Sequence, residues 1–273
     1  MAASSDLQTT SESINHSDDG EKYADGVQWD ELGFVITPTD FMYPMNCSDG
    51  NIFSQGHLIP YRNIELCPSA GILNYGQAIL EALKAVRTED GRIMLFRPEE
   101  NALRMKMGAE RMCMPSPSVE QFVDAVKQTV LANKRRVPPP GKGSLYLRPL
   151  LIGSGSVGSV GPAPECTFLI YASPVGNSSP VGNYRRRVNM IYKVYQAQKQ
   201  ARAKGFSDIL YLDSVTGKCI EEISSANIFI VKVEERLIPL DDLLKADEAF
   251  CTGTAVTVNP VGSVTYDTKR CLQ

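Results

Sequence analysis

The sequence has 273 residues and a formal net charge of −3 at pH 7. That length suits one large domain or two smaller ones. Because the charge is close to neutral, nothing suggests nucleic acid or an anionic membrane as a partner. No run of apolar residues is long enough to cross a bilayer. These features indicate a soluble globular protein.

The cysteine and histidine content narrows the range of possible sites. The seven cysteines are widely spread and never form a C-x-x-C pair, which argues for reduced thiols and against a disulfide frame or a zinc site. Only two histidines are present, His16 and His57. Two histidines are too few to favour a catalytic triad or a metal site that depends on histidine, and we expect no metal site.

Residues 1–25 are rich in serine, threonine and acidic residues and show no apolar periodicity, which is typical of a disordered tail. An organelle transit peptide is rich in arginine and poor in acidic residues. This tail instead contains Asp6, Glu12, Asp18 and Asp19 and no arginine. The composition therefore favours a cytoplasmic location.

Residues 26–172 have the pattern of a smaller α/β domain. Short apolar pieces separated by turn signals predict hairpins over residues 29–68. An apolar stripe at helical spacing predicts a helix over residues 73–87. Two more helices are predicted over residues 98–112 and 118–131. The first of these begins with proline and two glutamates, and the second begins with a serine followed three residues later by a glutamine, a capping box.

The apolar run 144–152 predicts a buried strand, and the glycines that follow it, residues 153–158, match the letters G-x-G-x-x-G. In that setting the pattern raises the possibility of a nucleotide-binding loop. Such a loop must lead into a helix, but the prolines within residues 161–164 prevent one. We therefore interpret the segment as a glycine-rich loop between two strands, the second over residues 167–172.

Residues 173–187 begin with proline, glycine and serine, which predicts an interdomain linker before a second domain over residues 188–273. The most informative stretch of that second domain is residues 219–232, CIEEISSANIFIVK. It places paired carboxylates, Glu221 and Glu222, before a polar turn and an apolar strand. An acidic residue at a strand end is usually a solvated flank of a hairpin, so this pattern alone does not identify a site.

Several segments, in order along the chain, resemble the branched-chain aminotransferases and most closely the plant members. The matching runs are NYGQ, LKAVRTEDGRIMLFRPEENALRM, GKGSLYLRPLLIGSG, GFSDILYLD, EEISSANIFIVK, ADEAFCTGTA and NPVGSVTY. The resemblance implies an α/β fold of the α+β type, namely the two-domain fold type IV. It also implies that residues 188–273 are a truncated, incomplete form of the larger domain, which binds pyridoxal phosphate.

The resemblance further implies an activity in amino-acid biosynthesis. Enzymes of this family transfer an amino group between leucine, isoleucine or valine and 2-oxoglutarate by a ping-pong route, using pyridoxal 5′-phosphate. The implied partners are therefore small amino acids and 2-oxo acids, together with a second copy of the chain in a homodimer. Neither nucleic acid nor a membrane is expected.

By resemblance, the cofactor-binding residues are Arg104, Glu222 and Thr254. The pyridine nitrogen stays protonated only beside a carboxylate, which is the position implied for Glu222. The phosphate suits an arginine fork and nearby hydroxyl and backbone donors, the positions implied for Arg104 and Thr254.

The implied substrate-binding residues are Tyr146, Arg148 and Ala255. Tyr146 and Arg148 belong to the run LYLRP, and Ala255 ends the run CTGTA. A charged arginine inside an otherwise apolar strand needs a partner, which favours a binding role for Arg148.

The segment that carries the family's Schiff-base lysine is missing. Counting back from Gly205 puts Arg186 at its position, or Asn189 if a small gap is allowed. An arginine stays protonated and a carboxamide is not an amine nucleophile, so neither residue replaces the lysine. The nearest lysine, Lys193, is out of register, and the sequence therefore assigns no catalytic residue.

A second block of the family is missing after Lys232, and the chain stops at Gln273, before the family's closing helix. Two alternatives to an active aminotransferase follow. One is a catalytically inactive relative, or a splice or gene-model variant, which the residue chemistry favours. The other is a different fold-type-IV enzyme such as a D-amino-acid transaminase, and the runs LYLRP and EEISSAN argue against it.

Overall fold

The computed structural model describes residues 23–33, 35–47, 52–176, 182–188, 194–213, 215–223, 226–230, 239–243, 246, 248–253, 257–266 and 269–272. The chain divides into two compact units, unit 1 (Met1–Asn177) and unit 2 (Ser178–Gln273). A strand of unit 1 ends at Val175 and a strand of unit 2 begins at Gly182. Regular structure therefore extends into both ends of the segment that the sequence predicts as a linker, residues 173–187.

Unit 1 contains an antiparallel sheet. Its strands are β1 (Phe41–Cys47), β2 (Ile59–Pro60), β3 (Ala78–Leu80), β4 (Leu83–Arg87), β5 (Ile93–Leu95), β6 (Ser144–Gly153) and β7 (Cys166–Val175). They lie in the order β2-β1-β7-β6-β4-β5, and β3 pairs with β6 beyond the end of β4. The predicted strands at residues 144–152 and 167–172 are confirmed as β6 and β7, which pair along their full lengths.

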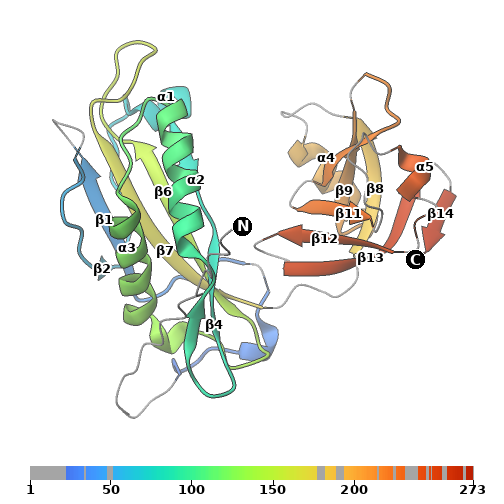
Figure 1. The fold of residues 1–273 in the computed structure, drawn as a ribbon, viewed down its shortest axis with the longest axis horizontal. Coiled ribbons are helices and arrows are strands. Elements are labelled where there is room, and N and C mark those ends of the chain that lie inside the picture. Colours follow the sequence, from blue (N-terminus) through green and yellow to red (C-terminus); the bar gives the residue numbers. More distant parts are fainter. Residues whose placement is uncertain are drawn as a thin grey trace, which may run out of the picture. The chain divides into compact units, whose positions relative to one another are not determined.

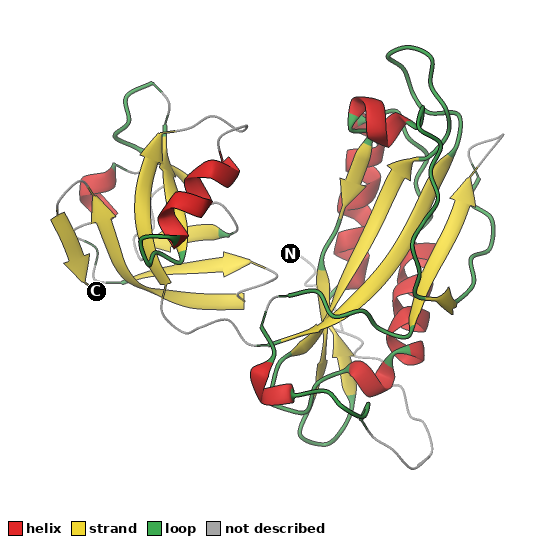
Figure 2. Ribbon diagram, turned by 180° about the vertical axis from the view of Figure 1, so that it is seen from behind, coloured by secondary structure: helices red, strands yellow, loops and turns green. Residues whose placement is uncertain are grey.

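Helices cover one face of this sheet. They are α2 (Pro98–Arg111) and α3 (Val119–Ala132). Unit 1 also contains the short helix α1 (Gly71–Tyr75) and the 3-10 turns η1 (Trp29–Glu31) and η2 (Lys134–Arg136). Figure 1 shows α2 and α3 in front of the strands, and Figure 2 shows the same sheet from behind. The core lies between these layers, where the fully buried rings of Phe122 and Phe168 meet with centroids 5.6 Å apart.

The start signals of α2 and α3 explain why these two helices were predicted correctly. Pro98 occupies the first turn of α2, where its missing N–H leaves no hydrogen bond unmade. At the start of α3 the backbone N–H of Gln121 donates to the Ser118 hydroxyl, and the Gln121 side chain accepts from the Ser118 N–H. This capping box satisfies helix-end groups locally, before any tertiary contact forms.

The helix predicted over residues 73–87 is wrong. A short helix, α1, ends at Gly76, which adopts the left-handed conformation with φ of 65°, and the chain then enters β3 and β4. In β4, Leu83 and Ala85 are buried while the side chains between and after them are less so, which is the two-residue period of a strand. Pairing with β6 on one side and β5 on the other therefore overrides the helical spacing of the apolar letters.

The glycine-rich loop after β6 contains no helix, as predicted. Gln77 anchors it: the Gln77 side chain accepts a hydrogen bond from the Ala163 N–H at 3.0 Å and donates one to the Met112 carbonyl at 3.3 Å. The Gln77 carbonyl also accepts from the Gly153 N–H. A Cβ at Gly153 would lie 2.4 Å from the Gln77 side-chain oxygen, so a larger residue here would push Gln77 out of its contact with the Ala163 N–H.

Unit 2 contains a second sheet. Its elements are β8 (Gly182–Val188), α4 (Val194–Arg202), β9 (Asp208–Leu212), β10 (Ile220–Ile223), β11 (Asn227–Ile230), α5 (Leu240–Leu243), β12 (Ala249–Gly253), β13 (Thr257–Tyr266) and β14 (Lys269–Leu272). The order is β10-β9-β8-β13-β12-β11, and β14 pairs with β13. Strand β8 runs parallel to both of its neighbours. The two end strands approach each other, since a bridge joins Ile223 to Ala226.

Strands β9 and β10 of unit 2 pair in antiparallel fashion and form a hairpin. Its turn is organised by Asp213, whose carboxylate accepts hydrogen bonds from the backbone N–H groups of Thr216, Lys218 and Cys219. Among the described residues of the whole chain, no helix is long and apolar enough to span a membrane.

Candidate functional site

Arg104 projects from α2 toward a carboxylate of the sheet. Its Nε and Nη2 atoms donate hydrogen bonds to the two carboxylate oxygens of Glu81, at 2.7 Å and 2.5 Å. The hydrogen bond to Glu81 raises the pKa of the guanidinium above its ordinary value. The Arg104 side chain is 68% exposed, whereas that of Glu81 is 3% exposed. Because a guanidinium carries several further N–H donors, Arg104 remains able to bind an anion.

Glu81 follows β3 directly and is fixed by a second residue of α2. Asn101 donates a hydrogen bond to one oxygen of the Glu81 carboxylate at 2.8 Å and another to the Ala82 carbonyl at 3.2 Å. Asn101 and Arg104 are three positions apart, so they lie on the same side of the helix. Together they satisfy a carboxylate that would otherwise be costly to bury.

Tyr146 and Arg148 lie on β6, two residues apart and therefore on the same face of the sheet. Leu145 and Leu147, which alternate with them, belong to the core beneath the helices, so the pair occupies the opposite face. Arg148 donates a hydrogen bond from Nη2 to the Tyr146 hydroxyl, and its guanidinium carbon lies 5.2 Å from the centre of the Tyr146 ring. The partner that a charged residue in this strand requires is therefore Tyr146.

Two neighbouring strands add further polar side chains to the sheet around this pair. Lys84 of β4 is the register partner of Tyr146, and Tyr171 of β7 is that of Arg148. Burial raises the pKa of Tyr146 above its ordinary value, and the nearby charge of Arg148 offsets only part of this rise. Burial lowers the pKa of Lys84. The Tyr171 ring also meets Tyr61 edge to face. Cations and phenols in this arrangement suit a carboxylate ligand.

In unit 2 the structure places one of the residues expected to bind the cofactor. Glu222 lies on β10 opposite Tyr211 of β9, and it is exposed. Thr254 and Ala255 lie outside the described residues. The roles of these three residues therefore stay predictions.

The positions that align with or lie nearest to the family's Schiff-base lysine are in or just after β8. Arg186 is within the strand, opposite Leu210 of β9, and nothing is described of its side chain. Asn189 and Lys193 lie outside the described residues.

Sequence reasoning missed Glu81 and Asn101 as parts of the site. The letters LEA at residues 80–82 say nothing about a contact with α2. The spacing of Asn101 and Arg104 is the signal that could have revealed a shared partner, because side chains three apart on a helix reach the same neighbour.

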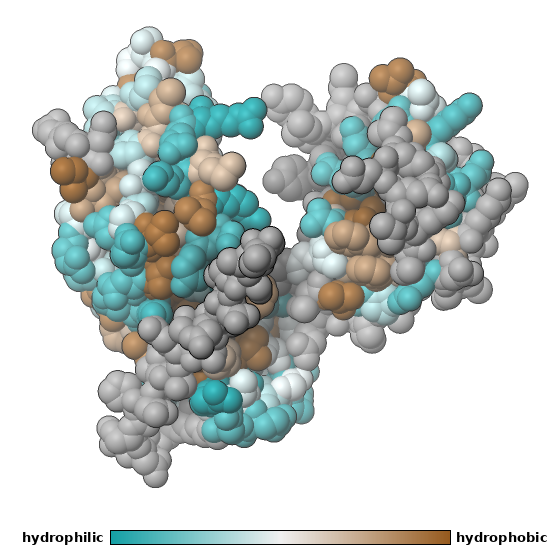
Figure 3. Space-filling model, viewed as in Figure 1, coloured by the Kyte–Doolittle hydropathy of each residue, from teal (hydrophilic) through white to brown (hydrophobic). Residues whose placement is uncertain are grey.

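Exposed apolar side chains flank the Glu81–Arg104 pair. Leu103 and Met107 of α2 are 46% and 70% exposed, and Leu80 is 58% exposed. Figure 3 shows brown, apolar patches on the face of unit 1 that carries the helices. Isolated apolar residues are common on protein surfaces, but a group of them beside a candidate site is a feature of contact surfaces.

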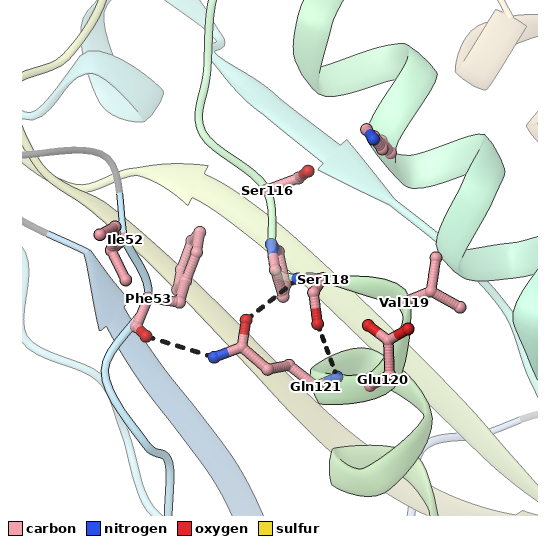
Figure 4. Close-up of a pocket in the computed structure, with 9 residues that line it drawn as sticks. Ile52, Phe53, Ser116, Ser118, Val119, Glu120 and Gln121 are labelled. Carbon is pink, nitrogen blue, oxygen red and sulfur yellow. Dashed lines mark hydrogen bonds between the residues drawn. The ribbon is translucent and has the colours of Figure 1, made fainter.

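A pocket of about 430 Å³ lies at the start of α3. Figure 4 shows its polar groups, in which the Ser118 hydroxyl caps the helix and the Gln121 side chain donates to the Phe53 carbonyl at 3.2 Å. None of the residues predicted for the site lines this pocket. Its polar side chains hold the helix end in place, and we assign it no ligand.

The described residues contain no cluster suited to a metal ion. They do contain a thiol with unusual acidity, Cys67. Hydrogen bonds with the side chains of Ser156 and Ser69 and with the Ser69 backbone lower the pKa of Cys67 to about 7. We therefore expect about half of Cys67 to be ionised at neutral pH, and its alkylation to rise steeply as the pH increases from about 6 to about 8.

This prediction is measured by mass spectrometry after brief treatment with iodoacetamide at several pH values. Cys113 is a matched control, because its side chain is also exposed. The Ser69→Ala variant should move the alkylation profile of Cys67 to higher pH. Identical profiles for Cys67 and Cys113 would contradict the prediction.

No protein-family model matches the chain. The chain is 53% identical to branched-chain amino acid aminotransferase 2, chloroplastic, of Humulus lupulus, over 89% of this chain and 72% of that protein. It is 50% identical to branched-chain-amino-acid aminotransferase 5, chloroplastic, of Arabidopsis thaliana, over 89% and 71%. It is 49% identical to branched-chain amino acid aminotransferase 1, mitochondrial, of Humulus lupulus, over 89% and 75%.

Solved structures share the fold. The branched-chain amino acid aminotransferase of Escherichia coli matches with a TM-score of 0.68 at 20% identity, over 86% of this chain and 89% of that one. Another branched-chain amino acid aminotransferase, in complex with N-(5′-phosphopyridoxyl)-L-glutamate, matches with a TM-score of 0.64 at 22% identity, over 84% and 87%. The predicted fold, a mixed α/β fold of type IV, is confirmed.

The alignment with the first relative also bears on the missing segments. It spans 296 residues, more than the 273 of this chain, although it includes only 89% of it. The relative therefore contains residues within the aligned span that this chain lacks, as predicted.

The expected cytoplasmic location is wrong. The relatives just described are named as chloroplastic or mitochondrial proteins, which points away from the cytoplasm. The expectation rested on the composition of residues 1–25, where acidic residues replace the arginines of a typical transit peptide. Composition alone was too weak a signal to decide the compartment.

Proposed function

Because this chain belongs to the branched-chain aminotransferase family, we propose that it binds pyridoxal 5′-phosphate and exchanges amino groups between leucine, isoleucine or valine and 2-oxoglutarate. The identity of 53% over 89% of the chain carries this proposal. It favours the family activity over an inactive relative and over a D-amino-acid transaminase. The proposed role is in the synthesis of branched-chain amino acids.

The donor set of unit 1 fits the phosphate of the cofactor. Arg104 is held by Glu81 on one edge and keeps N–H groups on the other, and a guanidinium edge matches the geometry of phosphate oxygens. We propose that Thr254 and Glu222 are also cofactor-binding residues, Thr254 through its hydroxyl and Glu222 by keeping the ring nitrogen protonated. When bound, the cofactor supplies an electron sink for the reaction.

Tyr146 and Arg148 are proposed to bind and orient the substrate, and Ala255 is proposed as a further substrate-binding residue. Their contact leaves a phenol and a guanidinium fixed together on one face of β6. In a ping-pong route, the same site accepts the amino acid and then the 2-oxo acid. A guanidinium there binds the additional carboxylate of 2-oxoglutarate.

The step that this chain is least able to catalyse is the transfer of the proton at the α carbon of the substrate. Neither Arg186 nor Asn189 is able to accept it and return it, since one stays protonated and the other is not basic. A positioned general base contributes roughly 10²–10⁴-fold to a rate. We therefore propose that turnover is slower than in a relative with the lysine by about that factor.

The proposal is tested by incubating the full chain with pyridoxal 5′-phosphate, L-leucine and 2-oxoglutarate, and by measuring the glutamate formed. We expect glutamate above the level produced by the cofactor without protein, and none above that level from D-leucine. A rate equal to the protein-free background would contradict the proposed activity. Glutamate from D-leucine alone would instead support the D-amino-acid transaminase alternative.

We also propose a homodimer, in which a second chain covers the exposed apolar group formed by Leu80, Leu103 and Met107. Light scattering of the same preparation checks this. A mass of 29.9 kDa, which is that of one chain, would contradict it.

A further inference from the structure

Glu81 carries a buried negative charge that none of the proposed chemical steps uses. Its carboxylate accepts hydrogen bonds from Nε and Nη2 of Arg104, and a further one from Asn101. Both oxygens are therefore occupied, and they hold one edge of the guanidinium. The N–H groups on the Nη1 side have no protein partner among the described residues, so this edge is left open to a ligand.

We propose that Glu81 is a positioning residue, which holds Arg104 so that its open edge receives the phosphate of the cofactor. Asn101 supports it by fixing the orientation of the carboxylate. This inference rests on the proposed function, because it takes the phosphate of pyridoxal 5′-phosphate as the anion that Arg104 binds.

The burial of Glu81 and the exposure of Arg104 indicate that their pairing orients the arginine and adds little to the stability of the fold. The carboxylate is 3% exposed and its partner 68% exposed. An ion pair with one partner in solvent contributes little to folding, while burial of the carboxylate has a cost. The pair does remove the rotational freedom of a long side chain before a ligand arrives. An arginine ordered in advance binds an anion more tightly than one that must be ordered on binding.

The test compares two ligands that differ only in the phosphate, pyridoxal 5′-phosphate and pyridoxal, by titration calorimetry on the full chain. The ratio of their dissociation constants measures the contribution of the phosphate. Glu81→Ala is expected to reduce this ratio roughly three- to tenfold, by the cost of ordering one side chain. Glu81→Gln keeps one acceptor oxygen and should have a smaller effect.

Glu100→Gln is the matched control, because Glu100 also lies on α2 and pairs with an arginine, Arg97, at 2.8 Å, but is exposed. It should leave the ratio unchanged. A structural role for Glu81 would weaken both ligands equally, and that result, or an unchanged ratio in Glu81→Ala, would overturn the inference. If Glu81→Ala does not fold, the ratio of the two dissociation constants is measured on Glu81→Gln instead, and an unchanged ratio there overturns the inference.

The Arg104→Ala variant distinguishes a failure of the positioning role of Glu81 from a failure of the proposed phosphate contact of Arg104. If this variant loses the preference for the phosphorylated ligand while the Glu81 variants keep it, the proposed phosphate site stands and the role of Glu81 is wrong. If Arg104→Ala keeps the preference, the proposed phosphate contact itself is wrong, and the positioning role is overturned with it.

Discussion

Introducing a lysine at position 189 or 186 is expected to raise leucine turnover by roughly 10²–10⁴-fold, the usual contribution of a positioned general acid–base group. The reason is chemical. An amine with an accessible free-base form accepts and returns a proton, whereas the guanidinium of Arg186 stays charged and the carboxamide of Asn189 is neutral. The variants Asn189→Lys and Arg186→Lys test the two possible registers separately.

Arg186 lies within β8, and Asn189 directly follows the end of that strand. Arg187→Lys is the matched control, since it introduces the same amine one position along the strand and should leave the rate unchanged. Turnover is measured as glutamate formed from L-leucine and 2-oxoglutarate. Borohydride reduction followed by peptide mapping should label the new lysine in the active variant only.

Lys193 provides the outcome that would contradict this prediction. If Lys193→Ala reduces turnover to the protein-free background, then the chain already uses that lysine, and the register inferred from the family is wrong. If neither introduced lysine increases the rate, the missing segment supplies more than its amine.

Arg148→Ala is expected to weaken the binding of 2-oxoglutarate by roughly 10- to 100-fold, the value of a hydrogen bond between charged groups. Leucine should be affected much less, because it lacks the second carboxylate that the proposal assigns to Arg148. The loss of Arg148 also removes the partner of the Tyr146 hydroxyl, so Tyr146→Phe measures the part of the effect due to orientation.

The dissociation constant of 2-oxoglutarate is measured by calorimetry with the pyridoxamine 5′-phosphate form of the protein. Arg92→Ala is the control, because Arg92 is an exposed arginine of the same unit that pairs with the nearby Asp90. An equal loss of leucine and 2-oxoglutarate affinity in Arg148→Ala would show that the residue does not discriminate between them.

Local signals explain which parts of the fold could be predicted. Helices α2 and α3 carry their own start signals, a proline in one case and a capping box in the other. Residues 73–87 carry apolar letters at helical spacing, but β4 within them pairs with strands both before and after α2 and α3 in the chain. Nothing within a window of fifteen letters reveals those partners.

At the site, too, a contact between residues close in the sequence could be predicted and a contact between distant residues could not. The contact between Tyr146 and Arg148 follows from the two-residue period of a strand, once β6 is recognised. The contact between Glu81 and Arg104 joins residues 23 apart, and it required α2 to fold onto the sheet. Glu222 is exposed on β10, and its role stays a prediction.

The anchoring of the glycine-rich loop by Gln77 limits how this region tolerates changes in length. The base of the loop is fixed, because Gly153 and Ala163 both bond to Gln77, and the Ser154 and Gly155 N–H groups bond to the Glu165 carbonyl. The tip, residues 158–162, is exposed. Insertions and deletions should therefore be tolerated at the tip and excluded from the base, which makes the tip a suitable place to introduce a peptide tag.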